Sequence, residues 1–246
     1  MSCRPLGRRW VAAAAVSLLA VLAACSGDDE SSETEHASYE PLTKETFGPA
    51  VSKAMAENGT VHVSGDMGGP DLDLWMEIGG KDAAMKGDLG DTALLLVDGD
   101  LYVRESSAAK WDRMPAGFST MMTSLLEDVS PETMATDYAE SLVALDYEGE
   151  EKIKGVELHA YRLTLDEEYV RKQVGAEAAE LGADPGALAG GDLPAMEFAT
   201  LLDGDDLMRQ VEISIAGQTM VMTMDQWGED VEIEAPPANE VQELRP

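Results

Sequence analysis

The stretch Leu72-Asp73-Leu74-Trp75-Met76-Glu77-Ile78 alternates apolar side chains with acids and a tryptophan. A period of two residues is typical of a β-strand, because successive side chains point to opposite faces of a sheet. The stretch therefore predicts a strand that places Leu72, Leu74, Met76 and Ile78 on one face.

The segments nearest to this strand extend it into a meander. Residues 43–58 place Phe47, Val51 and Met55 at helical spacing, and Asn58-Gly59 is a usual helix end. Asp98-Gly99 is a preferred hairpin turn between two further strands. The strands predicted in this half span residues 60–65, 72–78, 83–88, 93–97 and 101–104, with a short one around Trp111.

The second half of the chain returns to helix and then to strand. Helices are expected at 120–129, 131–145 and 166–181, the last with Asp166 as its N-cap. A loop of small residues is expected at 182–191. Strands are expected at 147–154, 156–165, 195–202, 207–215, 218–225 and 231–233. This order predicts an α+β fold with one domain and an antiparallel sheet, which curls because it is large.

Methionine and aliphatic side chains alternate along several of these strands. Methionine is flexible and polarizable, and it is common on surfaces that accept varied apolar ligands. Two interpretations follow: these side chains form an ordinary core beneath helices, or they line an apolar ligand site. The candidate ligand-binding residues are Leu72, Leu74, Met76, Ile78, Leu95, Val211, Ile213, Met220, Met222 and Met224.

The N-terminus reads as an export signal. Arg4, Arg8 and Arg9 precede an uncharged apolar run at 10–21, which is too short to span a bilayer comfortably. Leu22-Ala23-Ala24-Cys25 resembles the lipobox of bacterial lipoproteins, which implies diacylglyceryl transfer to the Cys25 thiol and cleavage before it. We expect a signal peptide at 1–24, a lipidated (diacylglycerol and palmitate) and disordered tether at 25–41, and a folded domain at 42–246.

Charge and cysteine content narrow the possible functions. The chain holds 48 acidic and 17 basic residues, for a formal charge of −31. Such a chain repels nucleic acid, so no nucleic-acid partner is expected. Its two cysteines are Cys3, which would leave with the leader, and Cys25, so the mature chain has no internal disulfide.

Catalytic and metal-binding motifs were sought and not found. The sequence has no G-x-S-x-G elbow, Walker loop or dinucleotide fingerprint, and His36, His62 and His159 have no metal-ligand spacing. We therefore expect no enzyme activity, no catalytic residues, no metal and no cofactor. Trp75, Trp111 and Trp227 could form a binding platform or simply pack the sheet.

Several phrases, in their order and spacing, resemble the LppX/LprAFG family of actinobacterial lipoproteins. They are Gly59-Thr60-Val61-His62-Val63, residues 97–103 with Lys110-Trp111, residues 153–161, Asp225-Gln226-Trp227-Gly228 and residues 233–237. The resemblance implies a half-barrel similar to LolA and LolB, in which a strongly curved antiparallel sheet packs helices on its concave face and leaves an apolar cavity.

The family's activity gives the expected function. The resemblance implies that the protein binds an acylated lipid or glycolipid and helps to move it across the envelope. It would be anchored through Cys25 at the outer face of the cytoplasmic membrane, and a membrane permease is a candidate partner. The alternative is an interaction or sensor module with the same fold and no lipid cargo.

Overall fold

The computed structural model describes residues 39–66, 69–78, 83–180, 196–215 and 218–243. Residues 40–246 form one compact unit, to which the following account applies. The predicted signal peptide, Cys25 and the loop 182–191 lie outside the described residues. The helices are α1 (Lys44–Asn58), α2 (Ala116–Asp128), α3 (Pro131–Ser141) and α4 (Glu167–Glu180), with a 3-10 turn at Ala238–Glu240.

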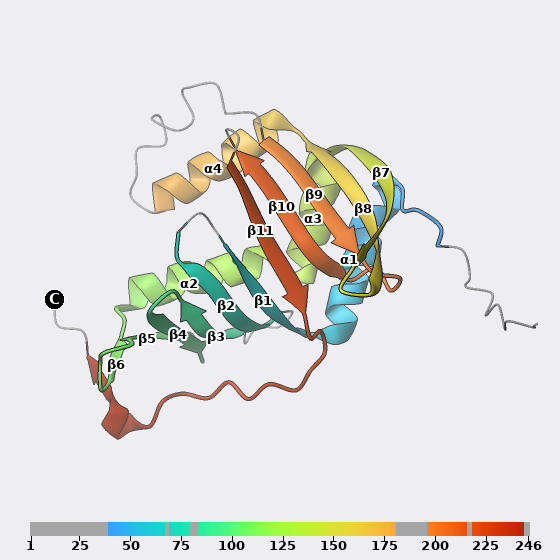
Figure 1. The fold of residues 1–246 in the computed structure, drawn as a ribbon. Helices are drawn as coiled ribbons and strands as arrows, with labels where there is room; N and C mark the ends of the chain where they lie inside the picture. Colours follow the sequence, from blue (N-terminus) through green and yellow to red (C-terminus); the bar gives the residue numbers. More distant parts are fainter. Residues whose placement is uncertain (1–38, 67–68, 79–82, 181–195, 216–217, 244–246) are drawn as a thin grey trace, which may run out of the picture. The chain divides into compact units, whose positions relative to one another are not determined.

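Twelve strands are described, and they form one open sheet. Its order is β12-β6-β5-β4-β3-β2-β1-β11-β10-β9-β8-β7 (Figure 1). Neighbouring strands are antiparallel except for β12 and β6, which are parallel. The strands are β1 (Thr60–Asp66), β2 (Asp71–Glu77), β3 (Ala84–Leu89), β4 (Thr92–Val97), β5 (Asp100–Glu105), β6 (Trp111–Arg113), β7 (Leu142–Ile153), β8 (Val156–Leu165), β9 (Met196–Leu202), β10 (Met208–Ile215), β11 (Gln218–Asp225) and β12 (Val241–Glu243).

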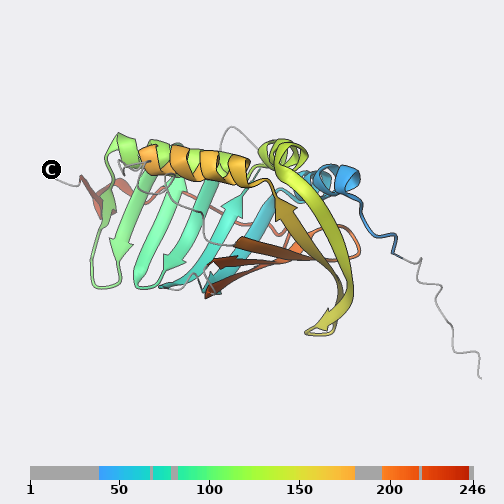
Figure 2. The same ribbon diagram turned by 90° about the horizontal axis from the view of Figure 1, so that it is seen from above.

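The helices lie on one side of the sheet (Figure 2). Helix α1 packs against α3 and β7, whereas α2 packs against β4 and β5. The Phe47 ring of α1 meets the rings of Tyr138 and Tyr161, with centroids 5.1 and 5.7 Å away. Further along, Leu126 of α2 packs against Leu74 and Leu96. The predicted α+β fold with a curved antiparallel sheet is confirmed.

Local signals for turns and caps were read correctly. Asp98 and Gly99 both have positive φ, at 52° and 76°, as the tight turn between β4 and β5 requires. The Asp166 carboxylate accepts a hydrogen bond from the Tyr169 N–H at 2.8 Å, so it caps α4 as predicted.

Two predicted boundaries were wrong. Residues 142–145 were expected to end a helix, but they begin β7, where Leu142 pairs with Leu165 across the sheet. Residues 231–233 were expected to form a strand and form none. There Ile233 packs on an apolar cluster while the Lys86 ammonium donates to the Glu232 carbonyl at 2.6 Å. Tertiary contacts, rather than strand pairing, hold this segment.

Two adjacent leucines of α2 test the orientation of this helix. Leu126 is 5% exposed, whereas Leu125 is 43% exposed. Leu126→Ala should lower the free energy of unfolding by about 2–5 kcal/mol, because it leaves a cavity beneath α2. Leu125→Ala, which makes the same change in helix propensity, should alter it by less than about 0.5 kcal/mol. Urea denaturation followed by circular dichroism measures both, and equal losses would contradict this packing.

Candidate functional site

Rows of apolar side chains cross the sheet on the face that carries the helices. Residues directly paired between strands share a face, so the register defines each row. One row reaches Tyr161, whose ring contacts α1, and this contact fixes the side. The rows are Leu72, Gly65, Met222, Val211, Thr200 and Tyr161; then Leu74, Val63 and Met224; then Met220, Ile213, Phe198 and Leu163.

Most of the candidate ligand-binding residues share this face. They are Leu72, Leu74, Met76, Val211, Ile213, Met220, Met222 and Met224. Ile78 lies just beyond the end of β2 and is 5% exposed.

Leu95 is placed on the opposite face, which corrects its assignment as a cavity candidate. It packs there with Val97, Tyr102 and Trp111. Strand β4 reads Thr-Ala-Leu-Leu-Leu-Val, so apolar side chains occupy both of its faces. This run has no polar–apolar alternation, so the sequence does not indicate which face Leu95 occupies. Leu94 and Leu96, the neighbours of Leu95, face α2.

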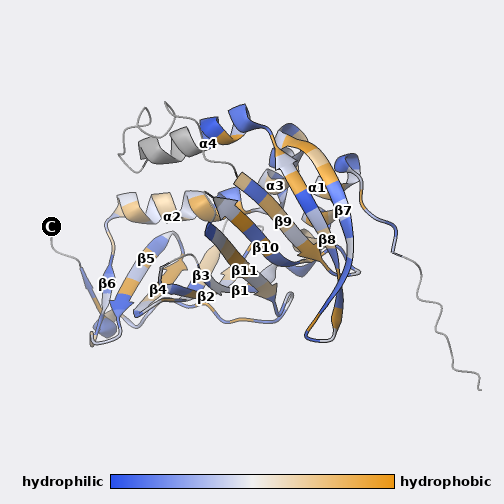
Figure 3. Cartoon of the chain, turned by 45° about the horizontal axis from the view of Figure 1, so that its top comes forward, coloured by the Kyte–Doolittle hydropathy of each residue, from blue (hydrophilic) through white to orange (hydrophobic). Residues whose placement is uncertain are grey.

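The apolar surface on β10 and β11 is only partly covered. We name it the methionine face, defined by Val211, Ile213, Met220, Met222 and Met224. All five side chains are half-buried, whereas Leu74 in the neighbouring core is 7% exposed. Among the described helices, none packs extensively on β9, β10 or β11. Bands of apolar and polar colour alternate along these strands (Figure 3). The methionine face is thus an apolar surface without a dense cover of described side chains.

Three further residues of the same rows were absent from the sequence-based set. Val63 joins Leu74 to Met224, and Phe198 and Leu163 continue the row of Met220. Their strands were predicted, but the sequence did not indicate which strands lie side by side. Only the pairing register shows that these side chains extend the methionine face.

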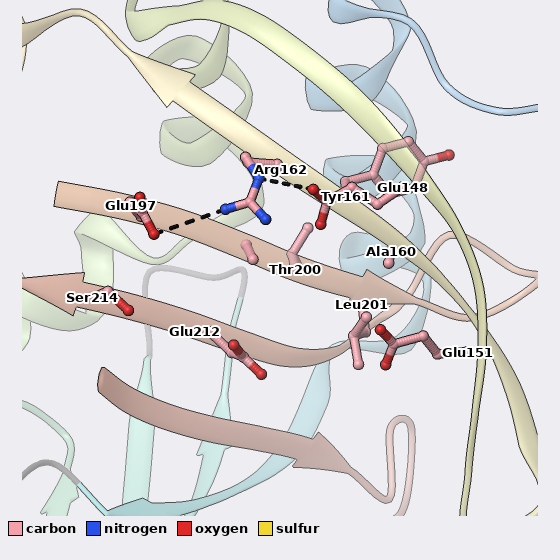
Figure 4. A pocket seen from close by; sticks show the side chains of 11 residues that line it. Glu148, Glu151, Ala160, Tyr161, Arg162, Glu197, Thr200, Leu201, Glu212 and Ser214 are labelled. Carbon is pink, nitrogen blue, oxygen red and sulfur yellow. Dashed lines mark hydrogen bonds and ion pairs between the residues drawn. The ribbon is translucent and has the colours of Figure 1, made fainter. Parts of the chain in front are cut away.

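A small hollow on the opposite face is polar (Figure 4). It measures about 140 Å³ and surrounds Arg162. The Arg162 Nε donates to Glu148 at 2.8 Å, and its Nη1 lies 3.9 Å from a Glu197 carboxylate oxygen. The hydrogen bond and the charge of Glu148 raise the pKa of Arg162. The hollow is too small and too charged for an acyl chain, and its arginine already has carboxylate partners.

His62 joins three strands on that same face. Its Nδ1 lies 2.7 Å from Asp225 on β11, and its Nε2 lies 3.0 Å from Asp73 on β2. The Trp75 ring lies 5.1 Å away between centroids. Burial alone would lower the pKa of His62, but hydrogen bonds to the two carboxylates and their charges together raise it above 6.5. Both ring nitrogens face acceptors, which suits the protonated imidazolium.

The raised pKa of His62 predicts a pH-dependent stability. The stabilisation should be complete below the unfolded-state pKa of about 6.5 and should fade as pH rises through the higher folded-state pKa. The wild-type protein should therefore exceed His62→Gln in stability by more at about pH 5.5 than at about pH 8.5. Urea midpoints at both pH values measure this difference.

The two carboxylates supply the control for this prediction. The same comparison is made in a background that carries Asp73→Asn and Asp225→Asn. There the stability advantage of His62 over the His62→Gln variant should differ less between about pH 5.5 and about pH 8.5. An equal advantage at both pH values in the unmodified background would contradict the role given to this cluster.

The other sequence candidates are not brought together. His159 is 3% exposed and its Nδ1 lies 3.3 Å from the Tyr147 hydroxyl, apart from the His62 cluster. His36 lies outside the described residues. Within the described ranges, no group of three His, Cys, Asp or Glu side chains is placed to hold a metal ion. No helix within those ranges is long and apolar enough to cross a membrane.

Sequence comparison identifies no relative: no family model matches the chain, and no curated protein matches it. Solved structures do. LprF from Mycobacterium bovis is similar over 78% of this chain and 96% of its own, with 13% identity and a TM-score of 0.53. The Mycobacterium tuberculosis lipoprotein LppX is similar over 78% and 98%, with 16% identity and a TM-score of 0.52.

A more distant likeness is to the LolA superfamily protein NE2245 from Nitrosomonas europaea. It extends over 78% of this chain and 96% of that one, with 10% identity and a TM-score of 0.27. At these low sequence identities a structural likeness shows only the fold. This chain shares its fold with LprF and LppX.

Proposed function

We propose that this protein is an envelope lipoprotein that binds an acylated lipid or glycolipid on the methionine face and assists its transfer across the cell envelope. The observation that carries the proposal is the half-buried state of Val211, Ile213, Met220, Met222 and Met224 on the helix-bearing face. The fold shared with LprF and the lipoprotein LppX supports it.

The physical chemistry of such a surface suits an acyl chain. Each CH₂ group that leaves water for an apolar surface gains about 0.8 kcal/mol, so ten such groups gain roughly 8 kcal/mol before the cost of ordering the chain. The methionine face contains no charged side chain that would have to be desolvated. Methionine side chains also adjust their shape to different chains. Binding and release need no catalytic group and no cofactor.

The anchor and the location form the second part of the proposal. Cys25 carries the lipid, residues 26–41 act as a tether, and the folded body works at the outer face of the cytoplasmic membrane. The full chain has a formal charge of −31, so the acidic body has no electrostatic attraction to anionic headgroups. A covalent lipid is therefore the more effective way to keep it at the membrane. A permease could supply or receive the cargo.

A pair of adjacent residues on β11 tests the lipid site. Met222 lies on the methionine face, and Thr223 points to the opposite face of the same strand. Met222→Asp should weaken binding of a pyrene-labelled phosphatidylcholine at least about tenfold, because a charge would have to be buried against the acyl chain. Thr223→Asp, the matched control, should leave binding unchanged.

The measurement is a fluorescence titration of the full chain, with native mass spectrometry of the lipid-loaded protein alongside. Circular dichroism tests whether each variant folds. If Met222→Asp does not fold, the uncharged Met222→Gln replaces it in the titration. Absence of lipid uptake by the folded wild-type protein, or equal binding by the Met222 and Thr223 variants, would refute the lipid site.

The two cysteines test the anchor. Cys25→Ala should abolish lipidation, so the variant should appear in the soluble fraction or remain as the uncleaved precursor. Cys3→Ala should behave as the wild type, because Cys3 precedes the proposed cleavage site. Membrane fractionation and intact-mass measurement determine where each variant is located and whether it is lipidated. A Cys25→Ala protein that is cleaved and still membrane-bound would disprove this anchor.

The outer side of α2 favours a second candidate, an interaction module. Phe118, Leu125 and Val129 are 51%, 43% and 38% exposed, and their spacing places them on one side of the helix. Exposed apolar groups of this kind mark protein or membrane contacts when they are contiguous. A folded protein that takes up no lipid, but loses a co-purifying partner on Phe118→Ser, would support this alternative.

A further inference from the structure

A second and larger cleft lies on the face opposite the helices. It measures about 500 Å³, which falls within the range of about 300–1,000 Å³ usual for small-molecule sites. Strands β2 to β6 supply its floor and one wall, and residues Glu232 and Glu234 of the C-terminal segment supply another. Trp75 and Trp111, two of the three tryptophans considered as a binding platform, both line this cleft.

The sheet register explains why these side chains gather here. Asp73 pairs with Asp88 across β2 and β3, and the same row continues through β4 to Arg104 on β5. In the next row Trp75 is paired with Lys86. These rows alternate with the apolar rows of the other face, so the same period of two residues produces both surfaces.

Contacts at the edges of the cleft hold its polar groups in place. The Arg104 guanidinium lies over the Trp111 ring, 4.4 Å from its centre. It therefore covers one side of this indole. Lys86 donates to the Glu232 carbonyl, and Ile233 packs on the Leu95 cluster. These two contacts hold the C-terminal segment, and Glu232 and Glu234 flank the partly buried Ile233.

The charges of the lining exclude two ligand classes. The lining holds the four carboxylates of Asp73, Asp88, Glu232 and Glu234 but only two cations, Lys86 and Arg104. Asp73 also pairs with His62, and the remaining excess of negative charge would still repel an anionic ligand. An acyl chain would require these charged groups to lose water without a compensating partner, which is costly. A simple cation is disfavoured because Lys86 and Arg104 already occupy the cleft.

We propose that this cleft binds a neutral saccharide. Sugar hydroxyls donate and accept hydrogen bonds together, so they can use both the carboxylates and the two cationic side chains. The apolar faces of sugar rings can pack on indole planes, which offer large rigid surfaces at low entropic cost. The site lies on the opposite face from the methionine face, and its existence does not depend on lipid binding.

Tryptophan fluorescence of the full chain tests this proposal. The chain is titrated with maltotriose, mannotriose and triacetylchitotriose, with sialyllactose as an anionic control and tetramethylammonium as a cationic one. At least one neutral trisaccharide should bind with a Kd below about 10 mM and change the emission, with calorimetry as confirmation. Trp227 is outside the cleft, its Nε1 donating to the Met208 carbonyl, so it should contribute little to the change.

Two exposed acids of the C-terminal segment give a matched pair. Glu234→Ala removes an acceptor from the cleft and should weaken binding about tenfold, whereas Asp230→Ala, which does not line the cleft, should leave binding unchanged. Trp111→Ala should reduce the fluorescence response and leave only the part that comes from Trp75, and a thermal melt checks that this variant folds. Met222→Asp should retain saccharide binding, which separates this site from the lipid site.

Three outcomes would overturn the proposal. They are binding of tetramethylammonium or sialyllactose without any neutral trisaccharide, no binding by the folded wild-type protein, and binding that Glu234→Ala and Asp230→Ala affect equally. The first outcome would reassign the cleft to a charged ligand.

Discussion

The antiparallel pairing of β1 with β11 is the constraint on which the rest of the structure depends. It joins the strands that precede α2 to those that follow α3, and so makes one sheet of two meanders. Val63 opposite Met224 and Gly65 opposite Met222 set its register. A slip of one residue would turn every methionine of β11 to the other face and separate His62 from Asp225. The apolar rows and the histidine cluster therefore share a single cause.

The methionine face and the charged sites lie on opposite faces of the sheet, although the Leu95 cluster gives the second face an apolar part as well. The helix-bearing face holds the apolar rows, and the opposite face holds the His62 cluster, the Arg162 ion pairs and the tryptophan-lined cleft. In a chain with a formal charge of −31, the strands still reserve alternate positions for uncharged side chains. The methionine face and the tryptophan-lined cleft therefore share no side chains. A change in one site can leave the lining of the other unchanged.

The fold was predictable over most segments with clear alternation or turn chemistry, residues 231–233 being an exception. Leu72 to Ile78, the Asp98-Gly99 turn and the Asp166 cap were all read correctly from local sequence. The prediction was wrong where the local pattern was uninformative. Leu95 lies in an apolar run that fills both faces of β4, Leu142 follows a helix without a stop signal, and Ile233 is held by tertiary packing. Likewise, no local signal indicates that β12 pairs with β6, or that Trp75 and Trp111 line one cleft.

The strand order also has a kinetic consequence. His62 and Asp225 lie side by side in the sheet although they are 163 residues apart in the chain. During synthesis the N-terminal part emerges first, so β1 must wait as an open edge until β11 is available. Closing so long a loop costs conformational entropy before the strand pairing can compensate for it. This cost makes folding slow. In that interval the exposed edge of β1 is the place where wrong strand pairing would begin, and a chaperone that delays folding would protect it.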